Sequence, residues 1–106
     1  MVDKNAIARA VKAELQQLYG DRLAKVILYG SYARGDFRDD SDMDFLVVLK
    51  DESIDIGKEL RLMNKPLYKI SDDYGIYLSS HPTTLSRLKK SQFLFYENVR
   101  REGVEV

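Results

Sequence analysis

Apolar residues in the first part of the chain recur first at helical and then at strand spacing. Four of them share one side of a predicted helix: Ile7, Val11, Leu15 and Leu18. The pattern predicts a helix over about residues 4–19, capped by Asp3 and ended by Gly20 with a positive φ. The short apolar, partly β-branched run 24–29 predicts a buried strand.

A second strand follows a break in the apolar pattern. Gly30 and Ser31 interrupt the first strand, and Ser31 is expected to begin one helical turn that ends before Gly35. A polar loop covers residues 36–41. Residues 43–49 are nearly all apolar after Asp44, which predicts a central strand covered on both faces.

The second half of the chain predicts three helical segments around a third strand. Apolar residues at helical spacing from 56 to 67 predict a helix that stops near Asn64 and restarts at Pro66, because proline disrupts a helix interior. Residues 75–80 predict a strand ended by His81 and Pro82. Thr83 or Thr84 is expected to cap a helix to about residue 90, and Ser91 another to about residue 102, which Gly103 ends. Residues 104–106 complete the pattern as an edge strand.

These elements predict the α/β (α+β) class, a small mixed sheet flanked by helices, in one domain over residues 1–106. The composition is that of a folded chain, with 44% apolar and 32% charged residues. The apolar runs are too short to cross a membrane, and the polar N-terminus lacks the features of a signal peptide. The chain has no cysteine, which excludes disulfides and thiolate metal sites. We therefore expect a cytoplasmic protein.

Charge is balanced overall but unevenly distributed. Seventeen basic and seventeen acidic residues cancel, which argues against general nucleic-acid binding. Eight acids and two bases lie between Asp36 and Asp55, whereas five bases and one acid lie between Arg87 and Arg101. An acidic centre suits a divalent metal ion. The basic end could meet phosphate or an acidic partner surface, although a solvated face is the simpler interpretation.

Two short sequences carry the candidate chemistry. Asp42 and Asp44 are two residues apart, so a strand would present both carboxylates on one face, where a cation such as Mg²⁺ or Mn²⁺ would relieve their repulsion. Gly30 and Ser31 end the neighbouring strand. Glycine allows close backbone approach, free N–H groups at a helix start bind phosphate, and the Ser31 hydroxyl adds a donor. The sequence thus predicts a phosphate-binding turn beside a metal site.

This arrangement resembles the signature of minimal nucleotidyltransferases in the DNA polymerase β superfamily. Ten residues separate Ser31 from Asp42, and Asp44 completes an Asp-x-Asp pair before an apolar strand. The resemblance implies a polymerase β-type fold, catalytic and metal-binding roles for Asp42 and Asp44, and a Mg²⁺- or Mn²⁺-dependent reaction with ATP. It also suggests nucleotide contacts from Gly30, Ser31, Arg34 and Ser41.

Two of these nucleotide contacts have alternatives. Arg34 could reach a phosphate or pair with Asp36, Asp39 or Asp40. Ser41 could instead order its loop through a side-chain bond to the backbone.

The third carboxylate of fully active family members is missing from the expected strand. Asp72 and Asp73 lie just before that strand, and neither Tyr77 nor Ser79 can act as a carboxylate base at neutral pH. Either catalysis then uses the two aspartates and a base from the substrate side, or the site is slow or inactive. His81, the only histidine, is interpreted as a surface residue.

Chains of this size are similar to antitoxins whose partners are HEPN-domain ribonuclease toxins. The resemblance implies transfer of AMP from ATP to a toxin hydroxyl, often of tyrosine. Two alternatives stay open: a catalytically weak or inactive antitoxin that neutralises the toxin by binding, and a transferase for a small molecule or an RNA end. The tyrosines at 68, 74 and 77 and the aromatic-rich run 93–96 could form a partner surface, unless Phe93, Leu94 and Val99 pack the last helix onto the sheet.

Overall fold

The order of elements follows the sequence pattern closely. The structure is a computed structural model that describes residues 3–38 and 40–106. The elements are α1 (Lys4–Tyr19), the 3-10 turn η1 (Gly20–Arg22), β1 (Leu23–Tyr29), α2 (Ser31–Arg34), β2 (Met43–Leu49), α3 (Ile56–Tyr74), β3 (Leu78–Thr84), α4 (Leu85–Lys90), α5 (Leu94–Glu102) and β4 (Val104–Glu105). The α/β class is confirmed.

The strands form one mixed four-stranded sheet in the order β3-β2-β1-β4. β1 runs antiparallel to both β2 and β4, and β2 runs parallel to β3. β2 is therefore central, as its apolar run predicts. Residues 45–49 are fully buried, because both faces of the sheet are covered.

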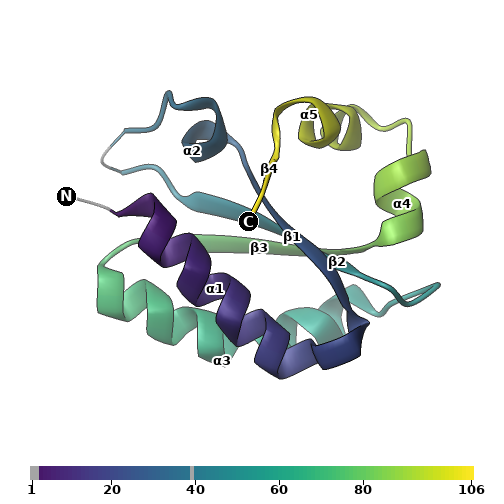
Figure 1. Cartoon of the computed structure of the whole chain (residues 1–106), viewed down its shortest axis with the longest axis horizontal. Coiled ribbons are helices and arrows are strands. Elements are labelled where there is room, and N and C mark those ends of the chain that lie inside the picture. The colour runs from purple at the N-terminus through teal and green to yellow at the C-terminus, as the bar shows by residue number, and fades with distance from the viewer. Residues whose placement is uncertain (1–2, 39) are drawn as a thin grey trace.

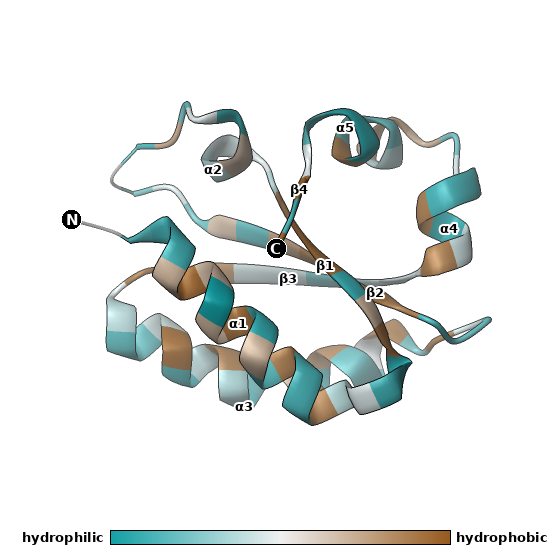
Figure 2. Cartoon of the chain, in the orientation of Figure 1, coloured by the Kyte–Doolittle hydropathy of each residue, from teal (hydrophilic) through white to brown (hydrophobic). Residues whose placement is uncertain are grey.

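Helices cover the two faces as separate layers (Figure 1). α1 and α3 lie side by side below the sheet, and α4 and α5 lie above it. Alternate residues of β2 serve the two layers: Phe45 and Val47 join the core under α1 and α3, whereas Leu46 and Val48 join a smaller core with Leu88 and Val99. Figure 2 shows the corresponding apolar positions on the strands and on the inner sides of the helices.

α1 confirms the boundaries that the sequence predicts. The Asp3 carboxylate accepts a hydrogen bond of 3.1 Å from the Ala6 N–H, and Gly20 ends the helix at φ 56°. Ile7, Val11 and Leu15 are fully buried, although Leu18 is 37% exposed. None of the helices within the described residues is long and apolar enough to cross a membrane.

The predicted break in α3 is wrong. The helix runs continuously from Ile56 to Tyr74 with Pro66 inside it. Proline removes the hydrogen bond to the carbonyl of residue 62, but Leu62 is 41% exposed, so water can satisfy that carbonyl. Burial of Met63 and Leu67 on either side favours the continuous helix.

The predicted end of β3 at His81 and Pro82 is also wrong, because the strand begins at Leu78 and continues to Thr84. β3 is an edge strand, and proline is tolerated where its nitrogen faces away from the neighbouring strand. The Met43 N–H donates to the Tyr77 carbonyl at 3.0 Å. Since peptide groups alternate in direction along a strand, the nitrogen of Pro82 points away from β2. Pro82 therefore costs the ladder no hydrogen bond.

The last elements agree with the sequence in order and differ in one boundary. The Thr84 hydroxyl accepts from the Arg87 N–H at 3.1 Å and caps α4, as predicted. The Ser91 hydroxyl accepts from the Phe93 N–H at 3.3 Å, but α5 begins only at Leu94. Gly103 ends α5, and β4 pairs with β1 as the predicted edge strand.

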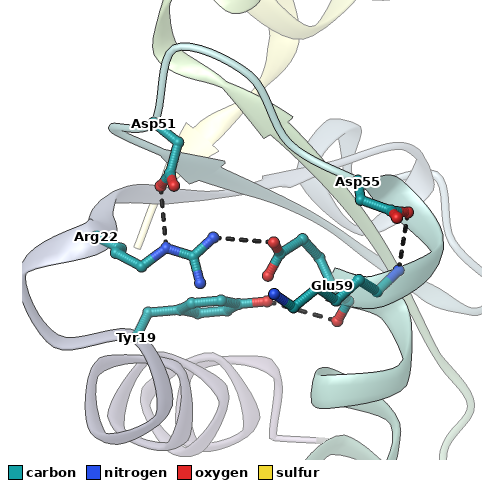
Figure 3. A network of polar contacts seen from close by, with 6 residues as sticks. Tyr19, Arg22, Asp51, Asp55 and Glu59 are labelled. Carbon is teal, nitrogen blue, oxygen red and sulfur yellow. Dashed lines mark hydrogen bonds and ion pairs between the residues drawn. The ribbon is translucent and has the colours of Figure 1, made fainter.

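A polar network joins the two lower helices to the end of the sheet (Figure 3). Arg22 donates to Asp51 at 3.0 Å and to the buried Glu59 at 2.9 Å. The Tyr19 ring lies beneath the guanidinium, 5.2 Å from its carbon to the ring centroid. Burial, followed by the Glu59 carboxylate, raises the pKa of Tyr19. Arg22 is therefore the main counter-charge of an acid that is 3% exposed.

We expect Arg22→Met to lower the free energy of unfolding by about 2 kcal/mol, because it leaves the buried Glu59 charge without its partner. The value is below that of a fully buried pair, since Arg22 is partly exposed. Denaturant unfolding measures this loss of stability, and Arg9→Met on the exposed side of α1 is the control. Equal stability of the two variants would contradict a role for the pair.

Candidate functional site

A sharp turn follows β1 and opens the one-turn helix α2. Gly30 adopts φ 75°, which favours glycine, and its carbonyl accepts from the N–H groups of Ala33 and Arg34, each at 3.1 Å. Gly35 ends α2 at φ 85°. Ser31 is the first residue of this helix, as predicted.

The two aspartates lie at the start of the central strand. Asp42 is exposed and directly precedes β2, whereas Asp44 is half-buried within it. Asp44 pairs in register with Tyr29 of β1 on one side and with Ser79 of β3 on the other. It alternates with Leu46 and Val48, so it faces the layer of α4 and α5.

The turn and the carboxylates meet at Gly30. A Cβ atom built on this glycine would overlap the Asp44 carboxylate. Residue 30 must therefore lack a side chain as well as adopt a positive φ. The structure thus brings Gly30 against Asp44, with Ser31 following directly.

The electrostatics of this region concentrate negative charge. Burial, and next the Asp42 charge, raises the pKa of Asp44, while a hydrogen bond from Ser79 and the positive charge of Arg34 act in the opposite direction. Burial, and next Asp44, raises the pKa of Tyr29 to about 12. Two carboxylates with such surroundings favour a positive ligand.

The donor set fits a hard divalent cation, although it is small. Asp42 and Asp44 supply oxygen ligands of the kind that Mg²⁺ and Mn²⁺ prefer. Within residues 3–38 and 40–106 no group of three or more His, Cys, Asp or Glu side chains could hold a metal ion. The two aspartates would therefore hold the ion with oxygen atoms from a nucleotide or water.

Arg34 and Ser41 both make contacts with the protein. Arg34 pairs with Asp36 at 3.2 Å, one of its predicted partners, and with Glu102 at 3.6 Å, which the sequence did not suggest. The Ser41 hydroxyl accepts from the Arg38 N–H at 2.8 Å, so it orders the loop by the side-chain bond predicted as its alternative role. Asp39, another proposed partner of Arg34, lies outside the described residues.

Residues from β3 and α5 complete the surroundings of Asp44. Ser79 occupies the position opposite Asp44, and β3 carries no acid. Asp72 and Asp73 are exposed in the last turn of α3. Phe95 of α5 packs on Tyr29 with centroids 5.3 Å apart and on His81 at 5.2 Å. His81 is thus half-buried rather than a surface residue, and burial lowers its pKa.

Comparison with known proteins identifies the family. The model of the nucleotidyltransferase domain family matches residues 8–99. The chain belongs to this family. The predicted enzyme class, nucleotidyltransferase, is therefore confirmed. The match includes the Gly30 turn, both aspartates and most of α5.

Relatives of this nucleotidyltransferase match nearly all of its length. Two proteins of Methanocaldococcus jannaschii, both named as candidate protein adenylyltransferases, are 36% and 34% identical to it. The first alignment covers 97% of this chain and 96% of the relative, and the second covers 94% and 95%.

Solved structures share the nucleotidyltransferase fold. A toxin–antitoxin crystal structure with AMP-PNP matches with a TM-score of 0.62 and 19% identity, covering 90% of this chain and 68% of that one. A variant of the MntA–HpeT toxin–antitoxin matches at 0.61 and 19%, covering 100% and 72%. A nucleotidyltransferase structure from Sulfolobus solfataricus matches at 0.61 and 17%, covering 95% and 82%.

We expect Gly30→Ala to destabilise the nucleotidyltransferase by about 1–3 kcal/mol more than Gly20→Ala. Gly30 (φ 75°, ψ −154°) and Gly20 (φ 56°, ψ −126°) both lie outside the left-handed helical region, so both substitutions carry a similar backbone cost, but a Cβ at residue 20 meets nothing within 4 Å. Denaturant unfolding measures the difference in stability. Titration of each variant with Mn²⁺ shows whether the added methyl group has displaced Asp44 and so weakened binding of the ion. Identical losses of stability would show that the Gly30–Asp44 contact is unimportant.

Proposed function

We propose that this nucleotidyltransferase transfers AMP from ATP to a tyrosine hydroxyl of a HEPN-domain ribonuclease toxin and thereby acts as its antitoxin. The observation that carries the proposal is the contact of the Gly30–Ser31 turn with the Asp44 carboxylate in a member of this family. The relatives named as protein adenylyltransferases support AMP transfer to protein. The toxin–antitoxin structures, one with an ATP analogue, support the nucleotide and the kind of partner.

Asp42 and Asp44 would hold Mg²⁺ or Mn²⁺. When bound, the ion supplies positive charge to the triphosphate and to the pyrophosphate that leaves. Gly30 allows the turn to lie against Asp44, and the Ser31 hydroxyl would donate a hydrogen bond to a phosphate bound there. Arg34 supplies a planar group of donors for a second phosphate oxygen. In this scheme Ser41 acts indirectly, by ordering the loop that leads to Asp42.

The reaction joins the acceptor oxygen to the α-phosphorus and breaks the bond between that phosphorus and the leaving pyrophosphate. The acceptor proton passes to solvent. A tyrosine hydroxyl has a pKa of about 10, far below that of an aliphatic hydroxyl, and so needs a weaker base. β3 offers Ser79 rather than an acid beside Asp44. This absence of a carboxylate on β3 favours a phenol as the acceptor.

Exposed apolar side chains support a protein acceptor. Phe93 is 75% exposed and Leu94 is 68% exposed at the start of α5, just before Phe95, whose ring packs on Tyr29. Val99, by contrast, is buried against the sheet. The alternative interpretation, that these residues pack the last helix onto the sheet, therefore holds for Val99 and not for Phe93 or Leu94. Tyr68 and Tyr77 are also more than 70% exposed, at 72% and 78%.

The missing acid on β3 also favours a second candidate, an antitoxin that neutralises its partner by binding alone. In this case the protein would keep the Gly30–Ser31 turn and both aspartates but would transfer no AMP. The two candidates differ in one observable, the covalent gain of AMP by the toxin.

We expect Asp42→Asn and Asp44→Asn each to reduce AMP transfer by about 10²-fold or more, since each removes half of the carboxylate charge. The measurement is the intact mass of a HEPN protein encoded beside the nucleotidyltransferase, after the two proteins are incubated with ATP and Mg²⁺. Asp40→Asn, in the exposed loop, is the control and should keep full transfer. A stable complex with no added AMP in the wild type would instead support the binding antitoxin.

A carboxylate placed opposite Asp44 should strengthen the metal site. We expect Ser79→Asp to raise Mn²⁺ affinity about tenfold, because affinity increases with the number of charged ligands. Ser80→Asp, on the opposite face of β3, is the matched control. Calorimetric titration with Mn²⁺ alone measures both variants. Equal affinities would place residue 79 outside the metal site.

A further inference from the structure

We propose that Glu102 is a positioning residue for nucleotide binding, which holds the Arg34 guanidinium beside the Gly30–Ser31 turn for contact with a phosphate. The inference rests on the proposed function and adds a residue from the far end of the chain to its site. It depends on the ion pairs of Arg34, on the anchoring of the last four residues and on the position of α2.

Arg34 is held by two carboxylates that use different nitrogens. The Asp36 carboxylate pairs with Nε at 3.2 Å, and the Glu102 carboxylate pairs with Nη1 at 3.6 Å. An arginine head group has five N–H donors in a plane. Among the described residues, these two ion pairs leave the hydrogens of Nη2 for a ligand. These two ion pairs favour an orientation of the guanidinium beside the turn, although the Arg34 side chain is 44% exposed.

The two carboxylates differ in how firmly they are placed. Asp36 belongs to the loop after α2, and its side chain is 63% exposed. The side chain of Glu102 is 31% exposed, at the end of α5, and its other oxygen contacts Arg101 at 3.4 Å. Glu102 is therefore the better fixed of the two partners.

The residues after Glu102 are anchored to β1, the strand that leads into the turn. The Gly103 N–H donates to the Val99 carbonyl at 2.8 Å, and a Cβ on Gly103 would lie 2.6 Å from Ile27. Val104 pairs with Leu28, and the Val106 N–H donates to the Val26 carbonyl at 2.9 Å. Glu102 and Gly30 are thus both fixed relative to the same strand.

Arg34 also lies close to the turn through its own backbone. Its N–H donates to the Gly30 carbonyl at 3.1 Å, and a Cβ atom on Gly30 would overlap the Asp44 carboxylate. A guanidinium one helical turn from Gly30 is well placed for a phosphate that binds between the turn and the aspartates. Losing Glu102 should therefore weaken nucleotide binding through Arg34 and through no other residue.

The test is a double-mutant cycle on nucleotide affinity. AMP-PNP with Mg²⁺ is titrated calorimetrically into the wild type, Glu102→Gln, Arg34→Gln and the double variant. We expect Glu102→Gln to weaken binding about two- to fivefold, the range of a half-exposed ion pair, and to have no effect once Arg34 is replaced. Glu97→Gln, in the first turn of α5, is the matched control and should bind as the wild type does.

The outcomes separate the inference from the proposed function. If the wild type binds AMP-PNP but the two substitutions have additive effects, Glu102 acts by stabilising the fold and the positioning role is wrong. Tighter binding by Glu102→Gln would also overturn it, because Glu102 would then compete with the nucleotide for Arg34. If the wild type binds no nucleotide, the proposed function and this inference fail together.

Discussion

Burial of β2 on both faces is the constraint on which the rest of the structure depends. Residues 45–49 are fully buried, so helices must cover the sheet above and below and strands must pair with β2 on both edges. This fixes β1 and β3 beside it in register. The same registers determine which side chains surround Asp44, because Tyr29 and Ser79 are its neighbours across the two strand pairs.

The candidate site depends on the close approach of the Gly30 turn to the Asp44 carboxylate. This geometry is costly, since Asp44 is half-buried, another carboxylate lies two residues away, and both influences raise its pKa. Such a cost is typical of functional sites, where charges are held in place for a ligand. The nearby positive charge is that of Arg34, itself held by Asp36 and Glu102. In the inference above, Glu102 from the far end of the chain orients this positive charge.

The family and the exposed apolar residues are consistent with a small enzyme that relies on its partner. In the proposed function the turn and the aspartates would bind the nucleotide, whereas the acceptor would come from another protein. Phe93 and Leu94 lie exposed beside the packed Phe95, at the edge of the layer that Asp44 faces. The large polar network of Arg22 and Glu59 lies elsewhere, between α3 and the end of the sheet, and serves stability.

Sequence alone determined most elements and the candidate chemistry. The spacing of Ile7, Val11 and Leu15, the apolar run of β2 and the order of Gly30, Ser31, Asp42 and Asp44 all depend on near neighbours in the chain. The continuous helix through Pro66 and the strand through Pro82 were missed, because local preference opposes both. Solvent exposure of Leu62 and the edge position of β3 make them tolerable.

Only the tertiary structure decided which distant residues meet at the site. The pairing of Ser79 with Asp44 follows from the parallel register of β2 and β3, and the contact of Glu102 with Arg34 follows from the docking of residues 103–106 on β1. Neither the Ser79–Asp44 pairing nor the Glu102–Arg34 contact can be read from periodicity in the sequence. Strand register and the packing of the last residues depend on many contacts together rather than on spacing along the chain.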